Sequence, residues 1–355
     1  MTTSRRSFGE QLFLAACRTI PLIPRFRGRN RAFLLLFDAL GLGRRHVIVE
    51  TTLKRPAEFR VRLDLHSWLQ RIAFLSGEYE GGTARFLVAL HAATGRRGPL
   101  LDVGANVGLI AIPAAMLLDR RGHGIEGEPR AICVEAVRAN VVALRENLRL
   151  SGTEHFISVL GDALGEEEKV VEIQVEGDLR DGEGSGTANI LAKGSTFQCE
   201  RIPLKVTTLD ALFGEGRLPT SCSVMKIDTD GYDLKVLQGG RRFLREARPV
   251  IFGEFSAHCM RWHGQSLGDV VATAEALSYE VWRRENGGGW AFSKDLGASP
   301  FIQDLLLVPS EDVKRFDWCL REGNRSVAGE AFPEVQGMER STVTDTNATY
   351  REKPE

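Results

Sequence analysis

The chain has 355 residues, of which 43% are hydrophobic and 26% are charged, and its formal net charge is −1 at pH 7. These values are typical of a globular protein and argue against a uniformly basic nucleic-acid-binding protein. The six cysteines are scattered and form no C-x-x-C pair, which indicates reduced thiols in a cytosolic protein. No apolar run reaches the ~18 residues that a membrane-spanning helix needs. We therefore expect a cytoplasmic protein without such a helix.

The first 45 residues are strongly basic, with nine arginines against Glu10 and Asp38. Apolar residues lie between these arginines, but Pro21 and Pro24 interrupt the pattern and no small-residue cleavage site follows, which argues against a signal peptide. Two interpretations are open. The segment is either an amphipathic element that contacts the anionic inner face of the membrane, or a helical lid packed on the main domain.

Residues 46–53 and 58–65 alternate apolar and charged positions and predict an antiparallel hairpin. Helices are expected over residues 68–74 and 83–94. We assign residues 1–95 to an N-terminal basic helical segment with a hairpin, and residues 96–310 to one α/β domain. Residues 311–355 form a tail that is poor in apolar residues from about residue 322, so we expect it to be partly disordered.

Seven strands alternate with helical segments in the α/β domain, at residues 100–103, 131–135, 156–160, 223–228, 249–255, 279–282 and 304–308. Strands joined by helical crossovers predict a doubly wound, Rossmann-like α/β sheet. An insertion at about residues 165–206 follows the third strand. It contains two further strand patterns, at 170–175 and 202–206, around a glycine-rich loop, and such an excursion can shape a substrate pocket.

The first of these strands leads into the run Leu100-Leu101-Asp102-Val103-Gly104-Ala105-Asn106-Val107-Gly108. A buried strand, a turn of small residues and a helix start are the means by which α/β folds hold nucleotide-like cofactors. Gly104 and Gly108 allow close approach of the backbone. The order G-A-N-V-G lacks the third glycine of the dinucleotide pattern G-x-G-x-x-G. This departure favours S-adenosylmethionine, which has no pyrophosphate, over NAD.

Ligands of open α/β sheets bind beyond the carboxyl ends of the strands. The second strand ends in Glu135, where a carboxylate can accept hydrogen bonds from ribose hydroxyls. The third ends in Asp162, where a carboxylate can accept from the adenine amino group. The alternatives are an exposed strand-end glutamate and a turn aspartate.

The fourth strand carries the densest polar cluster, Lys226-Ile227-Asp228-Thr229-Asp230. In strand geometry Lys226, Asp228 and Asp230 project to the same side. They could bind a hydroxyl-rich acceptor, remove its proton or hold a divalent cation, but the spacing of calcium loops is absent, and we predict no metal site. The alternative is a salt-bridged strand end with a helix cap.

The fifth strand ends in Glu254, and His258 follows four residues later. A histidine near neutral pKa is suited to act as a general base toward a substrate hydroxyl. The alternative is a structural histidine.

The ordered set Glu80, D-V-G-A-N-V-G, V-E-A at 134–136, T-L-D at 208–210, K-I-D-T-D-G-Y-D at 226–233 and R-P-V-I-F-G-E at 248–254 resembles the FkbM family of S-adenosylmethionine-dependent methyltransferases. The resemblance runs from about residue 79 to residue 308. It implies a class I methyltransferase fold and, for many members, O-methylation of sugars, polyketides or lipid-linked glycans. Two positions depart from the family pattern, because Ala136 replaces a proline and Asp230 replaces a glutamate. The insert at residues 121–129 is also unusual for the family.

The resemblance also implies roles by position. Asp102, Gly104, Asn106 and Gly108 would hold the methionine part of S-adenosylmethionine, Glu135 the ribose and Asp162 the adenine, while Glu80 would close over the cofactor. Asp228, Asp230 or His258 would take the acceptor proton, with Lys226 and Glu254 positioning the acceptor. The acceptor would be a small molecule or a glycan or lipid-linked compound, and no nucleic-acid partner is expected. Two other classes stay open: a Rossmann oxidoreductase using NAD(P), and a catalytically silent S-adenosylmethionine-binding module.

Overall fold

The computed structural model describes residues 46–123, 127–175, 188–190, 201–285, 289–296 and 302–320, together with seven isolated positions before residue 40. The expectations for the basic segment before residue 46, for the glycine-rich loop at 177–186 and for the tail from residue 322 lie outside the described residues. Within the described part of the chain, no helix is both long enough and apolar enough to cross a membrane.

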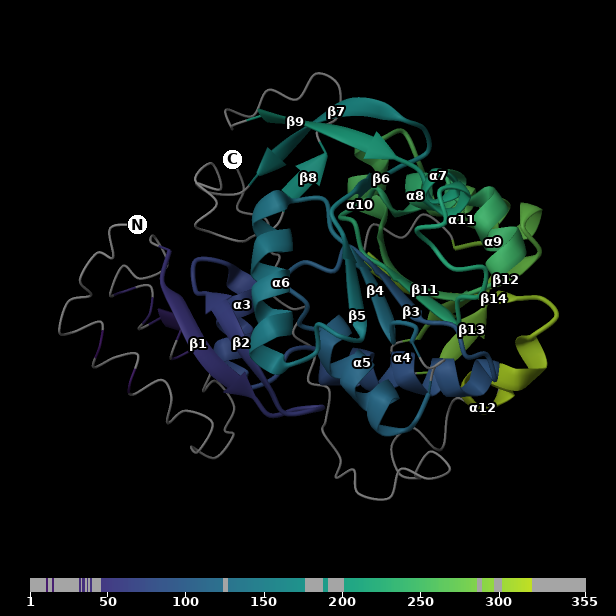
Figure 1. The fold of residues 1–355 in the computed structure, drawn as a ribbon. Coiled ribbons are helices and arrows are strands. Elements are labelled where there is room, and N and C mark those ends of the chain that lie inside the picture. The colour runs from purple at the N-terminus through teal and green to yellow at the C-terminus, as the bar shows by residue number, and fades with distance from the viewer. Residues whose placement is uncertain are drawn as a thin grey trace.

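An eight-stranded sheet forms the centre of the molecule (Figure 1), in the order β13-β12-β14-β11-β10-β3-β4-β5. Its strands are β3 (Leu100–Val103), β4 (Ala131–Val134), β5 (Ile157–Leu160), β10 (Val224–Ile227), β11 (Val250–Ser256), β12 (Tyr279–Arg284), β13 (Trp290–Phe292) and β14 (Ile302–Pro309). The five strands from β5 to β11 run parallel, and β14 is antiparallel to both β11 and β12. The predicted doubly wound α/β class is confirmed, and β13 adds an eighth strand that turns back beside β12.

Helices cover both faces of this sheet. One face carries α4 (Gly81–Thr94), α5 (Ala111–Arg120) and α6 (Arg138–Ser151), and the other carries α7 (Leu209–Gly214), α8 (Asp233–Gln238), α9 (Arg241–Ala247) and α11 (Leu267–Ala276). All residues of β3, β4 and β10 are buried. Strands covered on both faces are mostly apolar rather than alternating, so the charged residues Asp102 and Lys226 in two of them require an explanation.

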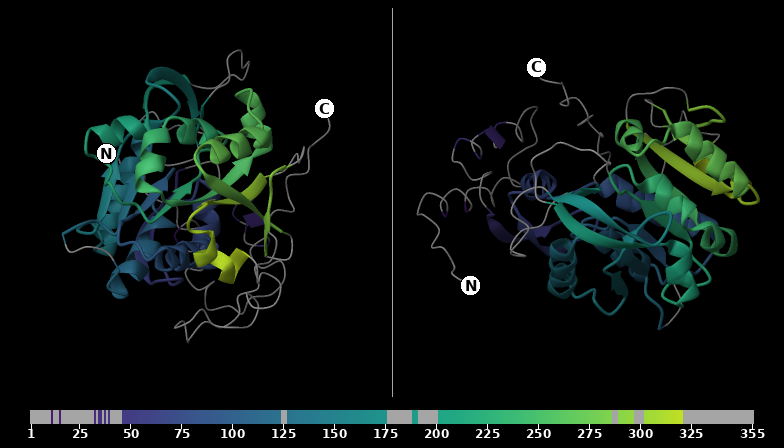
Figure 2. Two further views of the ribbon diagram at one scale, coloured as in Figure 1. Left: turned by 90° about the vertical axis from the view of Figure 1, so that its right-hand side faces the viewer. Right: turned by 90° about the horizontal axis from the view of Figure 1, so that it is seen from above.

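The predicted N-terminal hairpin is confirmed. β1 (Ile48–Leu53) and β2 (Phe59–Asp64) pair antiparallel, and α3 (Trp68–Ser76) follows them. Val61 and Leu63 of β2 belong to the same buried cluster as Leu144 and Leu148 of α6. The hydrophobic core therefore continues across residue 95. Figure 2 shows the hairpin on the opposite side of the molecule from β12 and β14.

The insertion forms a separate four-stranded sheet in the order β6-β9-β7-β8. Its strands are β6 (Ala163–Leu164), β7 (Lys169–Val175), β8 (Ala188–Ile190) and β9 (Arg201–Thr207). The two strands expected from the sequence correspond to β7 and β9, which pair antiparallel. β6 follows β5 directly, so this sheet lies beyond the carboxyl end of β5 (Figure 1).

The chain beyond residue 310 continues as the 3-10 helix η3 (Val313–Phe316) and α12 (Asp317–Leu320). Phe316, Cys319 and Leu320 are buried in the cluster that also contains α4 residues. This part of the predicted tail therefore belongs to the folded domain.

The buried histidine His91 predicts that the folded protein loses stability at acid pH. His91 of α4 is 3% exposed, its Nδ1 lies 2.5 Å from Ser223 Oγ, and its ring meets that of His123 at 5.2 Å. Burial, with a smaller effect of His123, lowers the pKa of His91 to about 4. Unfolded histidine has a pKa near ~6.5, so the unfolded state binds more protons between pH 6.5 and 4. Stability therefore falls as the pH falls through this window.

We expect His91 to account for a loss of about 3 kcal/mol in the free energy of unfolding between pH 7 and pH 4. Urea unfolding of the wild type and of His91→Gln across this range measures that contribution, which should be absent from the variant. His155→Gln, at an exposed histidine, is the control. Equal pH slopes in the wild type and in His91→Gln would refute the assignment.

Candidate active site

The strand register brings the candidate residues to one end of the sheet. Asp102 of β3 lies opposite Lys226 of β10. Two residues further toward the carboxyl ends of the strands, Asp228 follows β10. Glu254 on the neighbouring strand β11 lies opposite Asp304 of β14. Four of the predicted residues thus meet where ligands of open α/β sheets bind.

Lys226 is the centre of this group. Its Nζ lies 3.2 Å from Asp102 Oδ1, 3.4 Å from Asp228 Oδ2, and donates to the carbonyl of Gly104 at 3.3 Å. The lysine side chain is 6% exposed. Burial by itself would lower the pKa of Lys226, but Asp102, Asp228 and Glu80 raise it far above its ordinary value. Lys226 is therefore a fixed cation that links the loop after β3 to the residues after β10.

Asp102 is 1% exposed, and neither carboxylate oxygen has a hydrogen-bond partner among the described residues. Its ion-pair partner is Lys226, whose Nζ lies 3.2 Å from Oδ1. Burial raises the pKa of Asp102, and Lys226 opposes this shift. A buried carboxylate with free acceptor positions can receive an ammonium group.

The loop after β3 depends on its glycines for packing inside the protein. Gly104 has φ +79, and a Cβ there would stand 1.9 Å from the carbonyl oxygen of Asp228. At Gly108, with φ +87, a Cβ would meet Leu144 and Ile112 at 2.6 and 2.9 Å. The two glycines thus set how closely the loop approaches β10 and α6, and a direct ligand contact is not needed to explain them.

Asn106 and Glu135 form the next part of the site. Asn106 adopts a left-handed conformation with φ +50, and its buried Oδ1 has no partner among the described residues. Its backbone N–H donates to Glu135 Oε2 at 2.8 Å. Glu135 Oε1 accepts from Val137 N at 2.9 Å and from Asn140 Nδ2 at 3.2 Å. The carboxylate therefore organises this turn and keeps one acceptor position on Oε2 for a ligand hydroxyl.

Glu80 reaches the site from the N-terminal side. It precedes α4 in a left-handed conformation with φ +39. Burial raises the pKa of Glu80; Lys226 lowers it, Asp228 raises it, and the hydroxyls of Tyr79 and Thr83 lower it through hydrogen bonds. These interactions place Glu80 beside the Lys226 group, and its closure over the cofactor stays a prediction.

Glu254 has an unusual environment for a carboxylate. Its side chain keeps contact with solvent, yet surrounding protein atoms and the charges of Asp228, Asp304 and Glu80 raise its pKa to about 8, with Lys226 opposing them. Like charges directly opposite across a ladder are unfavourable. Arg284 compensates Asp304 through an ion pair of 2.8 Å. Glu254 is thus a carboxyl group whose pKa lies near neutral pH.

Asp162 lies apart from these residues. Both oxygens of its carboxylate pair with the guanidinium of Arg217, including Nη1 to Oδ1 at 3.1 Å. With Glu168, Lys205 and Thr207 these two residues line a polar pocket of about 290 Å³ between β5 and the insertion sheet. The pairing leaves the predicted adenine contact of Asp162 a prediction.

The strand geometry expected at Asp230 is wrong, and its placement beside Lys226 stays a prediction. β10 ends at Ile227, so strand alternation does not extend to Asp230, which has φ +51 and is exposed. Asp230 instead lies near Cys259 of α10 (Ala257–Trp262). The turn is organised by Asp233, which is 0% exposed. Its carboxylate accepts from Thr229 N, Thr229 Oγ1 and Gly231 N at 2.7, 2.8 and 3.1 Å.

Sequence reasoning did not identify the role of Asp233. The signal was available, because an aspartate can accept hydrogen bonds from backbone N–H groups a few residues earlier in the chain. Burial raises the pKa of Asp233 to about 6. The helix-cap alternative for this segment is not realised, because Tyr232 is the residue before α8 and no side chain caps that helix; Asp233 instead bonds back to the turn that precedes it.

His258 is exposed on α10, and its ring packs edge-on against the exposed Trp262 at 4.9 Å. Among the described residues, no contact joins it to Asp228 or Glu254. Met260, on the opposite side of the helix, is fully buried, so the His258 face points away from the core. Its role as a general base stays a prediction without structural support.

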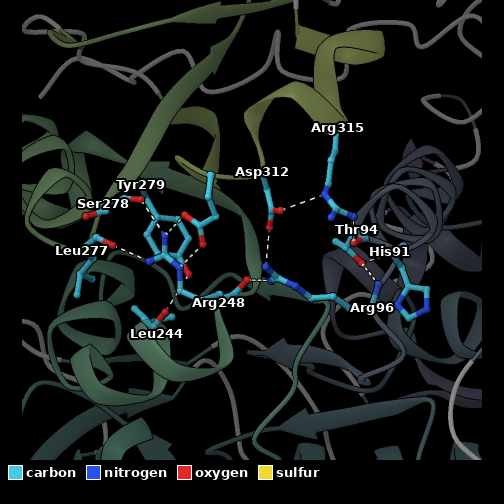
Figure 3. A network of polar contacts seen from close by, with 11 residues as sticks. His91, Thr94, Arg96, Leu244, Arg248, Leu277, Ser278, Tyr279, Asp312 and Arg315 are labelled. Atoms are coloured by element: carbon cyan, nitrogen blue, oxygen red, sulfur yellow. Dashed lines mark hydrogen bonds and ion pairs between the residues drawn. The ribbon is translucent and has the colours of Figure 1, made fainter.

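Arg248 of the R-P motif has a structural role at the amino end of β11 (Figure 3). Its guanidinium pairs with Glu311 at 2.6 Å, donates to the carbonyls of Leu277 and Ser278, and lies over the ring of Tyr279. The six residues to Glu254 span about 20 Å in a strand. The two ends of this motif thus have different roles. Arg248 stabilises the fold at the amino end of β11, and Glu254 belongs to the candidate site.

No group of three or more histidine, cysteine, aspartate or glutamate residues within the described chain could hold a metal ion. The polar atoms fit a cationic, hydroxyl-bearing methyl donor instead. Asn106 Oδ1 and the Asp102 carboxylate are buried acceptors, and Glu135 Oε2 can accept from a hydroxyl.

No curated protein matches the chain. Among solved structures, the FkbM methyltransferase from Methylobacillus flagellatus KT is similar at 18% identity, over 67% of this chain and 52% of that one, with a TM-score of 0.35. This chain thus covers about half the length of that protein. An O-methyltransferase from Bacillus cereus in complex with SAH is similar at 14% identity, over 84% and 99% of the two chains, with a TM-score of 0.35. Magnesium protoporphyrin IX methyltransferase from Synechocystis PCC 6803 is similar at 10% identity, over 68% and 84%, also with a TM-score of 0.35.

The model of the protein family "Methyltransferase FkbM domain" matches residues 102–281, just over half of the chain. The matched segment begins at Asp102 and includes Glu135, Lys226 and Glu254. The strand order and the free acceptors described above agree with S-adenosylmethionine as the methyl donor. The chain belongs to the family of FkbM-domain methyltransferases, which use S-adenosylmethionine.

Proposed function

We propose that the protein O-methylates a hydroxyl of a sugar, glycan, glycolipid or polyketide-type acceptor. The observation that carries this proposal is the position of Glu254 and Asp228 beside the Asp102–Lys226 pair, at the carboxyl ends of adjacent strands. A hydroxyl acceptor must lose a proton when its oxygen is methylated, and the cluster offers carboxylates for that task. Lys226 is always protonated and cannot act as the base.

The donor site is built from the residues that have free acceptors. Asp102 and Asn106 Oδ1 would receive the methionine ammonium group, Glu135 Oε2 would accept from a ribose hydroxyl, and Glu80 would close the site from the α4 side. S-adenosylmethionine supplies an activated methyl group on a sulfonium ion. The protein contributes mainly by holding the acceptor oxygen close to and in line with that methyl group.

We assign the base to Glu254. Its pKa of about 8 lies near neutral pH, where a carboxylate exchanges its proton most effectively in catalysis. Asp228 and Lys226 would position the acceptor hydroxyl next to it. Asp230 adopts a left-handed conformation beyond the end of β10 and His258 packs against Trp262, so both are weaker candidates.

Isothermal titration with S-adenosylhomocysteine tests the donor site. We expect the wild type to bind, and Asp102→Ala and Glu135→Ala to weaken binding at least tenfold, because each removes a buried acceptor. Glu154→Ala, at an exposed residue, is the control. Unchanged affinity in both variants, or no binding by the wild type, would refute the assignment.

Transfer of labelled methyl groups into a glycan or lipid extract tests the acceptor class. The expected result is a product one methyl group heavier, with the label on oxygen. Binding of S-adenosylhomocysteine without transfer to any extract would instead indicate a catalytically silent binding module. The contact of the basic residues before residue 46 with a membrane surface stays a prediction from the sequence.

A further inference from the structure

A buried amide connects the N-terminal hairpin to the loop after β3. Asn147, on the inner face of α6, is 0% exposed. Its Oδ1 accepts from the backbone N–H of Arg62 in β2 at 2.7 Å, and its Nδ2 donates to the carbonyl of Val107 at 2.9 Å. One side chain thus bonds to two backbone segments that are 45 residues apart in the sequence.

The chemistry of this position requires an amide. A carboxamide presents an acceptor and a donor at its two ends. Aspartate would keep the acceptor for Arg62 and lose the donor for Val107, whereas leucine would lose both. Each lost bond would leave a buried backbone group without its partner, which is unfavourable.

A second asparagine of α6 is connected to the loop after β3 through Glu135. Asn140 stands two helical turns before Asn147 and therefore on the same face of α6. It donates to Glu135, which in turn accepts from the backbone of Asn106 at 2.8 Å. The loop around the left-handed residue Asn106 is thus held by hydrogen bonds at two places, through Glu135 and at Val107.

The hairpin contacts both sides of the donor site. Nη1 of Arg62 donates to both carboxylate oxygens of Glu146 in α6, at 2.7 and 2.8 Å. At the other end of the hairpin, Lys54 N donates to the carbonyl of Gly77 at 3.0 Å, three residues before Glu80. The hairpin therefore supports the loop through Asn147 and the Glu80 segment through its turn.

We propose that Asn147 is a positioning residue that couples the hairpin to the donor-binding loop, so that the hairpin is a component of the methyl-donor site. The coupling keeps Asn106 and Val107 in the conformation that receives the donor. A ligand that binds one conformation loses apparent affinity in proportion to the population of that conformation. The inference rests on the donor site proposed above and does not depend on the acceptor.

The test uses the full chain and the variants Asn147→Leu and Asn147→Asp, with Arg62→Ala as the matched control. Arg62→Ala removes the surface ion pair with Glu146 but keeps the backbone N–H that Asn147 accepts from. Hydrogen–deuterium exchange without ligand is measured first. We expect amides at residues 105–112 to exchange about tenfold faster in both Asn147 variants, with amides of α9 and β12 unchanged. In Asn147→Asp the amide of Arg62 should keep its protection.

Titration with S-adenosylhomocysteine follows on the same proteins. We expect about tenfold weaker binding in both Asn147 variants and wild-type affinity in Arg62→Ala. Faster exchange spread evenly over the molecule, or local exchange with unchanged affinity, would overturn the proposal. A wild type that binds no S-adenosylhomocysteine would overturn the donor site itself, which separates the two failures.

Discussion

Glu254→Gln is expected to lower the rate of methyl transfer by about 10²–10⁴-fold, the usual contribution of a general base. Glutamine keeps the size and the hydrogen-bonding capacity of the side chain but cannot take a proton. Binding of S-adenosylhomocysteine should stay near wild type, because Glu254 is not among the residues proposed to hold the methyl donor. The measurement is labelled methyl transfer into the extract fraction that the wild type methylates.

The pH profile gives a second, independent result. A base with a pKa of about 8 is mostly protonated at pH 7, so kcat/KM should rise about tenfold per pH unit below 8 and level off above it. The carboxyl signal of Glu254 in a carbon-13-labelled protein should titrate near pH 8 and be absent from Glu254→Gln. This second readout requires no acceptor.

The alternative bases are tested with His258→Gln and Asp230→Asn in the same assay. Asparagine tolerates the left-handed conformation of residue 230, so the backbone there is preserved. We expect both variants to keep transfer within a few-fold of wild type. A loss in either one as large as that of Glu254→Gln would move the base to that residue.

The positions of seven strands along the chain and the polar residues near their carboxyl ends could be predicted from the sequence, because buried parallel strands are apolar runs and their carboxyl ends lie together. Asp102, Glu135, Lys226 and Glu254 were identified in this way. The hydrogen-bond and ion-pair partners of each carboxylate could not be predicted. Glu135 bonds mainly to its own turn, and Asp162 pairs with Arg217, 55 residues later. Such pairings depend on tertiary contacts that local patterns do not contain.

Asp230 shows a second reason for error. Its predicted direction relied on strand geometry that ends three residues earlier, at Ile227. Element boundaries are set by turn chemistry, here by the bonds of Asp233 to Thr229 and Gly231. The role of Asn147 could not be predicted from the sequence. A polar residue in an amphipathic helix gives no sign that it is buried until β2 and the loop after β3 are placed around it.

Lys226→Met is expected to lower the free energy of unfolding by about 3–5 kcal/mol at neutral pH, the usual effect of removing one partner of a buried ion pair. Methionine fits the volume of the lysine stem, so the loss arises from charge. Asp102 would remain 1% exposed without a cation, and its pKa in the folded state would rise further above the unfolded value near ~3.9. Lys226→Arg, which keeps the charge, is the control.

The pH dependence of this variant separates charge from packing. Where a carboxyl pKa is higher in the folded state, the folded protein binds more protons above the unfolded pKa, so stability falls as the pH rises. Lys226→Met should therefore recover toward wild type when the pH is lowered from 7 to about 5. Asp102→Asn in the same background should restore stability at pH 7, which makes the two substitutions strongly non-additive. Additive losses at every pH would instead show that Lys226 contributes through packing alone, and that the pair at the centre of the site is not held by charge.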